Sequence, residues 1–326
     1  MKVQQSDFPP DRGYAEPDPQ TPHVLVLGGG GILGEAWMSA LLAGLEDCDE
    51  FDARNCSSYV GTSAGSIVAA SLAAGLEPGF RLGPLSPSAP TLVADQRTRA
   101  FGQLFGAATN IAGALAAPFV SLASASTTTG GAALRRTVLR GMPTGERSLA
   151  ELGRELDLAG VQWNGRLRIV ALDVESGRRV VFGSPGAPEI SVAGAVEASC
   201  AIPGVFRPVR ANGRTYVDGG MWSPTNMDAA AVRKGDRVLC LNPTGSLRPT
   251  IGALMGAFGP LSRSAAGAEA LVIRNRGATV TTINPDHATA AAMGTNLMDA
   301  EARQAVIDAG LAQGRRLAAQ RQARAA

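Results

Sequence analysis

Short apolar runs alternate with glycine turns and longer stretches of small apolar residues in the first part of the chain. Residues 24–27 form one such run, and a second run ends at Val60. Each run is followed by glycines and then by a helix-length stretch, which extends to about Glu46 in the first case and to Gly75 in the second. Two successive strand, turn and helix units predict a parallel sheet with crossover helices, which is an α/β fold.

Strand signals return in the second half of the chain. The segment RLRIVALDVESGRRVVFGS predicts a hairpin that turns at residues 175–177. Further strands are expected at residues 215–217, 237–241 and 279–283. From residue 299 onward, apolar residues recur at helical spacing between Arg and Gln, which predicts a terminal amphipathic helix with a solvated arginine face.

Three segments lack this alternation. Residues 1–21 are polar and proline-rich without the apolar stretch of a signal peptide, so we expect a disordered N-terminal segment. Residues 78–145 are expected to form a helical cap inserted over the sheet edge. Within the cap, residues 100–134 carry no charge, and three interpretations stay open: helices packed on the body, a lid in peripheral membrane contact, or a membrane span. The main domain then covers residues 22–314, and a basic C-terminal tail covers residues 315–326.

Composition excludes some classes of protein. The chain has 326 residues, of which 45% are hydrophobic, and this is enough for a sizeable core. A formal net charge of +2 gives no broad attraction to nucleic acid, so no nucleic-acid partner is expected. The four cysteines form no CxxC pair, which argues against a zinc site, and we expect a cytoplasmic chain with reduced thiols.

The pentapeptide Gly61-Thr62-Ser63-Ala64-Gly65 is the strongest candidate for a catalytic motif. It lies between an expected strand and an expected helix, which is the setting of a nucleophile elbow. A serine on such a sharp turn brings its flanking backbone close together, so small residues are needed two positions before and after it. The helix that begins at Ala64 would direct its amide dipoles toward developing negative charge.

A second glycine-rich turn precedes the first expected helix. Gly29, Gly31 and Gly34 satisfy the pattern GxGxxG, and Gly30 leaves the loop without side chains in its first half. Such a loop at a helix start suits an oxyanion hole or the pyrophosphate of a dinucleotide. The dinucleotide hypothesis needs an acid at the end of the next strand, but Glu50 and Asp52 precede that strand, and GTSAG occupies the required place. The dinucleotide hypothesis is therefore the weaker one.

A further candidate is Asp218, which ends a short expected strand. Gly219 and Gly220 follow it, a pattern that in isolation also suits an ordinary turn. Of the two histidines, His23 precedes the first strand, where a structural role is expected, and His287 lies in the predicted loop NPDHATAAAM. Two hypotheses stay open on the residues alone: a Ser–His–acid triad that uses His287, or a dyad in which Asp218 is the base.

Taken in order, these motifs resemble those of the patatin-like phospholipases. Residues 29–34 match the oxyanion loop GxGxxG, GTSAG around Ser63 matches GxSxG, and Asp218 with its two glycines matches DG[GA]. The segments EASCAIPGVFRPV, SPTNMDAA and MGTNLMDAEARQAVIDAG are similar to the family as well. The resemblance covers residues 22–314, with a weak middle at residues 78–145.

The resemblance implies a three-layer α/β/α fold with a mainly parallel central sheet and a helical cap insertion. It also implies a serine lipid acyl hydrolase that needs no metal and no cofactor. Ser63 would be the nucleophile and Asp218 its base, and the amides of Gly29, Gly30 and Gly31 would form the oxyanion hole. The implied substrates are carboxylic esters of phospholipids or lysophospholipids.

One departure from the family pattern concerns the oxyanion loop. Many members carry Arg or Lys just before its last glycine, where this chain has Leu33. Cations that could offset the change are Arg97, Arg99 and Arg207. The departure keeps two alternatives open: a neutral-lipid lipase or carboxylesterase, and a catalytically silent lipid-binding protein.

Two further expectations follow from the resemblance. In a Ser–Asp dyad, His287 would be a bystander. The uncharged residues 100–134, together with the apolar run at residues 251–261, are the candidate acyl-binding cap, and they would carry any peripheral membrane contact.

Overall fold

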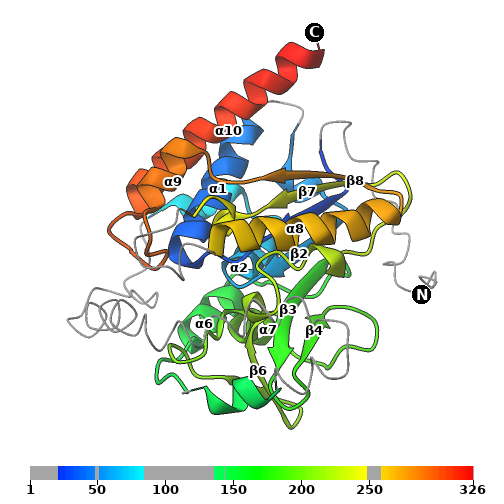
Figure 1. The fold of residues 1–326 in the computed structure, drawn as a ribbon, viewed down its shortest axis with the longest axis vertical. Helices are drawn as coiled ribbons and strands as arrows, with labels where there is room; N and C mark the ends of the chain where they lie inside the picture. Colours follow the sequence, from blue (N-terminus) through cyan, green and yellow to red (C-terminus); the bar gives the residue numbers. More distant parts are fainter. Residues whose placement is uncertain (1–20, 48–50, 84–135, 143, 248–257, 326) are drawn as a thin grey trace.

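The structure is a computed structural model, and it describes residues 21–47, 51–83, 136–142, 144–247 and 258–325. In these residues the backbone forms one sheet of eight strands with helices on both faces (Figure 1). The three-layer α/β/α fold with a mainly parallel central sheet is therefore confirmed.

The strand order is β5-β6-β3-β2-β1-β7-β8, and β4 pairs with the remaining edge of β3. Strands β2, β1 and β7 link β3 to β8 by parallel pairing, whereas β4 and β6 run antiparallel to β3. The strand bounds are β1 Val24–Leu27, β2 Ser58–Thr62, β3 Leu167–Asp173, β4 Arg178–Phe182, β5 Val209–Ala211, β6 Arg214–Asp218, β7 Arg237–Leu241 and β8 Thr279–Ile283. The α-helices are α1 Gly31–Glu46, α2 Ala64–Ala73, α6 Ala150–Leu158, α7 Val192–Cys200, α8 Phe258–Asn275, α9 His287–Met293 and α10 Arg303–Ala325.

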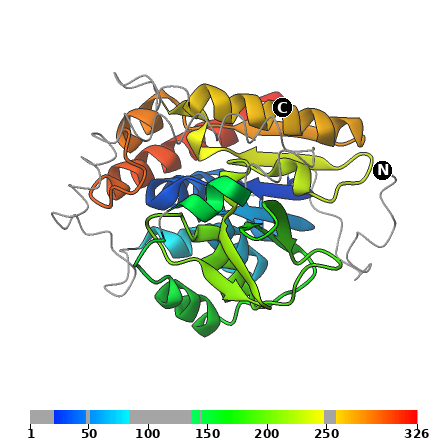
Figure 2. The ribbon, with the colours of Figure 1, turned by 60° about the horizontal axis from the view of Figure 1, so that its bottom comes forward.

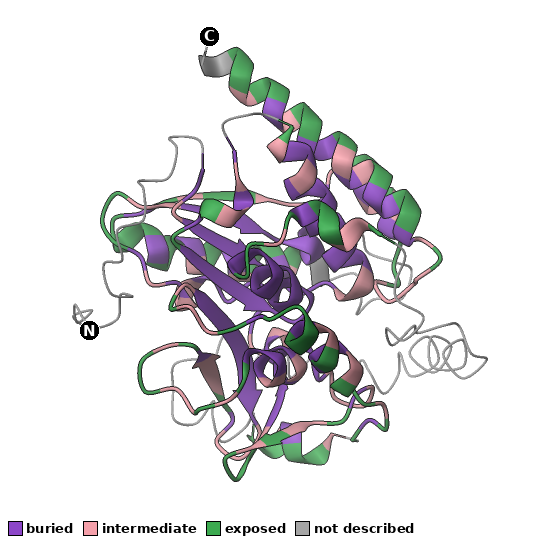
Figure 3. Ribbon diagram, turned by 180° about the vertical axis from the view of Figure 1, so that it is seen from behind, coloured by how far each residue is buried: buried purple, intermediate pink, exposed green. Residues whose placement is uncertain are grey.

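Both faces of the central strands are covered. On β1, Leu25 and Leu27 pack into a core with α1, α2 and α7, and Val24 and Val26 pack into a second core with α8. Figure 2 shows the gold helix α8 along one side of the strands, and Figure 3 shows the strands coloured as buried. Burial on both faces explains why these strands appear in the sequence as continuous apolar runs.

The pairing of β3 brings two distant loops together. Residues 169–173 pair with β4 along one edge. On the other edge, β2 pairs with residues 167–170 and β6 with residues 171–173. Because β2 runs parallel and β6 antiparallel to β3, their carboxyl ends face each other, with Thr62 opposite Val170 and Asp218 opposite Ala171. The residues that follow these two strand ends therefore meet in space.

The strands expected at residues 24–27, 237–241 and 279–283 are confirmed with these bounds, and so is the hairpin with its turn at residues 175–177. The segment that contains His287 was expected to be a loop, and this was wrong, because it forms α9. Its apolar residues are mostly alanines, so no helical periodicity stands out in the sequence.

The C-terminal residues form a continuous helix. Residues 315–325 continue α10 without a break, so they are part of a long helix rather than a separate tail. A Cβ atom on Gly314 would lie 2.4 Å from the carbonyl oxygen of Leu41, and one on Gly44 would lie 2.5 Å from that of Leu311. These glycines let α10 pack directly on the backbone of α1, and the end of α10 projects from the body (Figure 1).

Only the ends of the expected cap lie in the described part of the chain. Residues Pro78–Leu82 form a 3-10 helix, η3, and residues 136–141 are helical. Residues 100–134, and with them the lid and membrane-contact interpretations, lie outside the described residues, as do Arg97 and Arg99. Of the run 251–261, residues 258–261 belong to α8.

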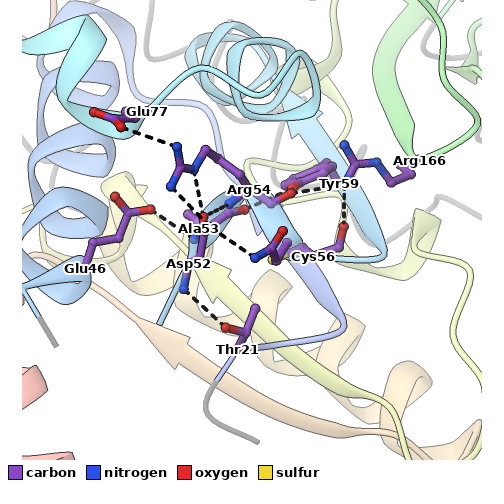
Figure 4. Close-up of polar contacts among 10 residues, drawn as sticks. Thr21, Glu46, Asp52, Ala53, Arg54, Cys56, Tyr59, Glu77 and Arg166 are labelled. Carbon is purple, nitrogen blue, oxygen red and sulfur yellow. Dashed lines mark hydrogen bonds and ion pairs between the residues drawn. The ribbon is translucent and has the colours of Figure 1, made fainter. Parts of the chain in front are cut away.

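A polar cluster closes the amino ends of β2 and β3 (Figure 4). Arg54 bonds to Asp52 at 2.9 Å, and its carbonyl oxygen accepts hydrogen bonds from the Tyr59 hydroxyl at 2.6 Å and from Arg166 at 3.0 Å. The Asp52 carboxylate is thus bonded to Arg54. It also lies at the amino ends of the strands, whereas α/β proteins bind dinucleotides at the carboxyl ends. This arrangement does not support the dinucleotide hypothesis; Glu50 lies outside the described residues.

Candidate active site

Ser63 lies on a strained turn between β2 and α2. Its backbone has φ 50° and ψ −126°, in a region that residues other than glycine rarely adopt. A Cβ atom on Gly65 would lie 2.0 Å from the carbonyl oxygen of Leu27, and one on Gly61 would lie 2.5 Å from the Cα atom of Ser66. The turn therefore requires glycine at both positions, as a nucleophile elbow does.

Two further serines fix the backbone of Ser63. Its amide donates a 2.8 Å hydrogen bond to the Ser199 hydroxyl, which in turn donates to the carbonyl oxygen of Val170 on β3 at 2.6 Å. The Ser66 hydroxyl donates to the Ser63 carbonyl oxygen at 2.6 Å. The Ser63 amide is thus fixed through α7 to β3, and the Ser63 carbonyl is fixed by α2.

Asp218 is buried at the end of β6, where the pairing of β3 brings it to Ser63. Burial raises the pKa of the Asp218 carboxyl group to about 6, although hydrogen bonds from the Ser63 hydroxyl and the Gly220 amide oppose the shift. The Gly220 amide lies 2.6 Å from the carboxylate oxygen. A Cβ atom on Gly219 would lie 2.3 Å from the carbonyl oxygen of Val170, so glycine is needed for this close approach to β3.

The glycine loop after β1 lies against the nucleophile. A Cβ atom on Gly29 would lie 3.4 Å from that of Ser63. The Gly29 amide donates to the carbonyl oxygen of Pro224 at 2.8 Å, so it is not free to bind an oxyanion. Within the described residues, the amides of Gly30 and Gly31 have no hydrogen-bond acceptor. Of the three amides expected to form an oxyanion hole, the Gly29 amide is therefore engaged, and those of Gly30 and Gly31 are available.

The remainder of the glycine loop is packed by distant segments. A Cβ atom on Gly34 would lie 3.1 Å from that of Pro243, and one on Gly31 would lie 2.6 Å from the sulfur of Met298. The Leu33 side chain is fully buried in the core rather than in the pocket, and the Leu33 amide donates to the carbonyl oxygen of Leu297 at 3.0 Å. The departure at position 33 is thus a core residue.

A loop at residues 223–228 contacts all three motifs, and we call it the bridging loop. Its Asn226 side chain donates to the Thr62 hydroxyl at 3.2 Å and to the carbonyl oxygen of Gly219 at 3.1 Å. Its Pro224 carbonyl is the acceptor for the Gly29 amide. Asn226 has φ 48°, which allows its fully buried side chain to reach both neighbours. Asn226 therefore links the residue before the nucleophile to the residue after Asp218.

Side chains of α8 and β4 bind the bridging loop. The Glu269 carboxylate accepts hydrogen bonds from the Thr225 hydroxyl at 2.5 Å and from the Met227 amide at 2.8 Å. Arg179 on β4 pairs with Asp228 at 2.5 Å. The loop is thus bonded on both sides of Asn226.

A pocket of about 100 Å³ opens at Ser63. Most of its wall is apolar and comes from α2, α6 and the segments after α7 and α9: Ile67, Leu149, Leu152, Ile202, Phe206 and Met298. Glu35, Arg81 and Glu155 supply charge to the same pocket. A mainly apolar pocket with a few charged groups beside a nucleophile is typical of a site for an amphiphilic substrate.

The structure does not bring either histidine to Ser63. His287 is exposed on α9, which follows β8, and β8 lies three strands from β2. At about 4.8 Å per strand, this separation is about 14 Å. His23 accepts a hydrogen bond from the Arg237 amide at 3.0 Å, in agreement with the expected structural role.

The patatin-like phospholipase model matches residues 25–231 of the sequence. The chain belongs to this family. The match covers more than half of the chain and includes the glycine loop, the nucleophile elbow and the Asp218 motif. Membership assigns the chain to the lipid acyl hydrolases in general. No curated protein matches the sequence.

Solved structures with a similar fold include VipD and ExoU. VipD from Legionella pneumophila is 17% identical with a TM-score of 0.44, over 92% of this chain and 67% of that one. The type III effector protein ExoU is 16% identical with a TM-score of 0.34, over 90% of this chain and 53% of that one. The ExoU–SpcU complex from the type III secretion system of Pseudomonas aeruginosa is 19% identical with a TM-score of 0.32, over 90% of this chain and 51% of that one. The chain thus spans two thirds of VipD and about half of ExoU.

Among the described side chains, no group of three or more potential metal ligands occurs. Across the same described ranges, no helix combines the length and the apolarity needed to cross a bilayer.

Sequence reasoning missed several residues of this patatin-like site. Ser199 and Asn226 lie in two segments that resemble the family, EASCAIPGVFRPV and SPTNMDAA, so the resemblance could have found them. Arg81 and Glu35 carry no such signal, because they come together only through the packing of η3 on α1.

Proposed function

We propose that the protein is a serine lipid acyl hydrolase that cleaves carboxylic esters of phospholipids or lysophospholipids with Ser63 and Asp218 as a dyad. The observation that carries this proposal is the meeting of the ends of β2 and β6, which brings Ser63 to Asp218, a buried carboxyl group whose pKa burial raises to about 6. Such a group is ionised at neutral pH and remains basic enough to accept a proton.

In the proposed reaction, the Ser63 oxygen attacks the ester carbonyl carbon while Asp218 accepts the hydroxyl proton. The carbonyl oxygen becomes an oxyanion beside the amides of Gly30 and Gly31, at the start of α1. Collapse of this intermediate breaks the ester bond, and the leaving alcohol takes the proton from Asp218. Water then attacks the acyl-enzyme and gives a proton to Asp218. Collapse of the second intermediate breaks the bond to Ser63, whose oxygen takes the proton from Asp218, and the fatty acid is released.

The neighbouring hydrogen bonds support this assignment of roles. Asn226 ties the strand of the nucleophile to the loop of the base, and Ser199 fixes the nucleophile's amide. These contacts hold the two groups in one geometry before substrate binds, which is how an enzyme lowers the entropic part of its barrier.

The test is hydrolysis of p-nitrophenyl esters of increasing acyl length by the wild type, Ser63→Ala and His287→Ala, with circular dichroism to confirm folding. Ser63→Ala should lose at least ~10³-fold in kcat, and His287→Ala should keep wild-type activity. A loss in His287→Ala as large as that in Ser63→Ala would contradict the dyad. No turnover of any ester by the wild type would favour a catalytically silent lipid-binding protein.

A further inference from the structure

The charged wall of the pocket contains groups that the proposed reaction does not use. Among the described residues, three charged side chains line the pocket together with Ser63: Glu35 on α1, Arg81 on η3 and Glu155 on α6. The other lining residues are apolar or small. Charge in such a pocket is unfavourable unless a partner compensates it, so each of the three groups needs an explanation.

Arg81 is held in place, but not all of its hydrogen-bond donors have an acceptor. Its Nε and Nη2 atoms both lie 2.6 Å from one oxygen of Glu35, which is buried. Arg303 donates hydrogen bonds to the carbonyl oxygens of Arg81 and Gly83, which fixes the backbone of η3. Within the described residues, the Nη1 group of Arg81 has no acceptor. A guanidinium group with free donors on a fixed backbone suits a phosphate oxygen.

Glu155 presents the opposite charge. Its Oε1 atom is buried and has no hydrogen-bond partner among the described residues. Leu152 and Leu149 line the same pocket about one and two turns before Glu155. A carboxylate oxygen left unpaired beside apolar groups loses its hydration without compensation. Glu155 takes part in no salt bridge among the described residues, and an ammonium group on the substrate would compensate its charge.

We infer that this pocket binds a zwitterionic glycerophospholipid head group, with its phosphate on Arg81 and its ammonium group on Glu155. The inference rests on the proposed function, because it places the head group beside the ester that Ser63 attacks. A lipid with only a phosphate leaves Glu155 unpaired and faces its negative charge. A neutral glyceride leaves the Nη1 donors of Arg81 and the charge of Glu155 without a partner, so the pocket disfavours both alternatives.

The test compares three substrates with one acyl chain: a monoacylglycerophosphocholine, a monoacylglycerophosphate and a monoacylglycerol. The wild type should have the highest kcat/KM for the phosphocholine. Arg81→Gln should lower the preference for phosphocholine over monoacylglycerol by about 10-fold or more, the value of a lost hydrogen bond to a charged group. Glu155→Gln should lower the preference for phosphocholine over phosphate by about 10-fold or more, because it removes the negative charge that faces the trimethylammonium group.

Two further variants separate recognition from stability. The double variant Glu35→Gln/Arg81→Gln removes the ion pair together and should lose the same preference as Arg81→Gln. Arg154→Gln, on the exposed side of α6, is the matched control for Glu155→Gln and should keep every ratio.

Equal kcat/KM of the wild type for the three substrates would overturn the inference, and so would unchanged ratios in Arg81→Gln and Glu155→Gln. If the wild type hydrolyses p-nitrophenyl esters and Ser63→Ala does not, such a result leaves the proposed function intact. If the wild type hydrolyses neither lipids nor p-nitrophenyl esters, the proposed function fails and this inference fails with it.

Discussion

Burial of the Asp218 carboxyl group makes stability depend on pH, and an Asp218→Asn variant should remove this dependence. Burial raises the pKa of Asp218 from 3.8 to about 6, against hydrogen bonds from Ser63 and Gly220 that lower it. A raised pKa means that the folded protein binds the proton more tightly than the unfolded chain does. The wild type therefore loses stability as the pH rises from about 4 to about 6, and the loss persists at higher pH.

The size of this effect follows from the shift. Asp218 is only 4% exposed, so solvent screens the group very little. A shift of about 2 pKa units corresponds to about 3 kcal/mol, at about 1.36 kcal/mol per unit. Asparagine is almost isosteric, carries no charge and keeps an oxygen that accepts from the Gly220 amide. The free energy of unfolding of Asp218→Asn should therefore be up to about 3 kcal/mol higher than that of the wild type at pH 8. Below pH ~4 the two free energies of unfolding should be equal.

Urea unfolding of both proteins at pH 4, 6 and 8 measures this difference, and ester hydrolysis measures the loss of activity. Asp286→Asn is the matched control with the opposite sign. Although burial raises the pKa of Asp286, hydrogen bonds from Thr289 and the Arg316 charge lower it overall. The wild type gains stability from this carboxylate above its unfolded pKa and loses it as the pH falls, so the control should be less stable at pH 8. A gain for Asp218→Asn that is the same at pH 4 and pH 8 would refute the reasoning.

Three further outcomes are expected from the same geometry. The acidic limb of the kcat/KM profile should have an apparent pKa of about 6, with activity rising as the pH rises, because Asp218 must be ionised to act; a limb near 4 would contradict its role. Asn226→Asp loses the donors that join the two catalytic loops and should lower kcat by ~10–100-fold with little change in KM. Asn212→Asp, at an exposed residue with a similar φ of 51°, should not change kcat, and a melting-temperature loss without a kcat effect in Asn226→Asp would argue for a structural role only. Gly65→Ala should not fold to an active protein, because its Cβ atom would lie 2.0 Å from the Leu27 carbonyl oxygen, and a soluble, active variant would contradict the packing described.

The parts of the site that depend on local backbone demands could be predicted from the sequence. Gly61 and Gly65 flank a residue whose turn leaves no room for side chains, and Gly219 faces the backbone of β3 at close range. Because only glycine fits at these positions, the motif in the sequence directly indicates the close contacts. The central strands could be predicted for a related reason, since burial on both faces makes them continuous apolar runs.

The parts that depend on long-range packing could not be predicted. Asn226 and Thr62 are 164 positions apart, and only the bridging loop reveals their contact. Arg81 reaches Glu35 across 46 positions because η3 folds back on α1. Likewise, Gly29, Gly30 and Gly31 cannot be told apart in the sequence. Only the folded structure shows that the Gly29 amide already donates to the Pro224 carbonyl. Helix α9 was missed because alanines give no periodic signal.

The end-to-end arrangement of β2 and β6 means that strand register sets the distance between the nucleophile and the base. A slip of one residue along β3 would move Asp218 by about 3.3 Å and turn its side chain to the other face of the sheet. The distance between the reacting groups thus depends on main-chain pairing to one strand, whereas η3 and α6, which supply Arg81 and Glu155 to the pocket, lie outside that pairing. Substitutions in those two helices can change which lipid the pocket accepts while the reacting groups keep their separation.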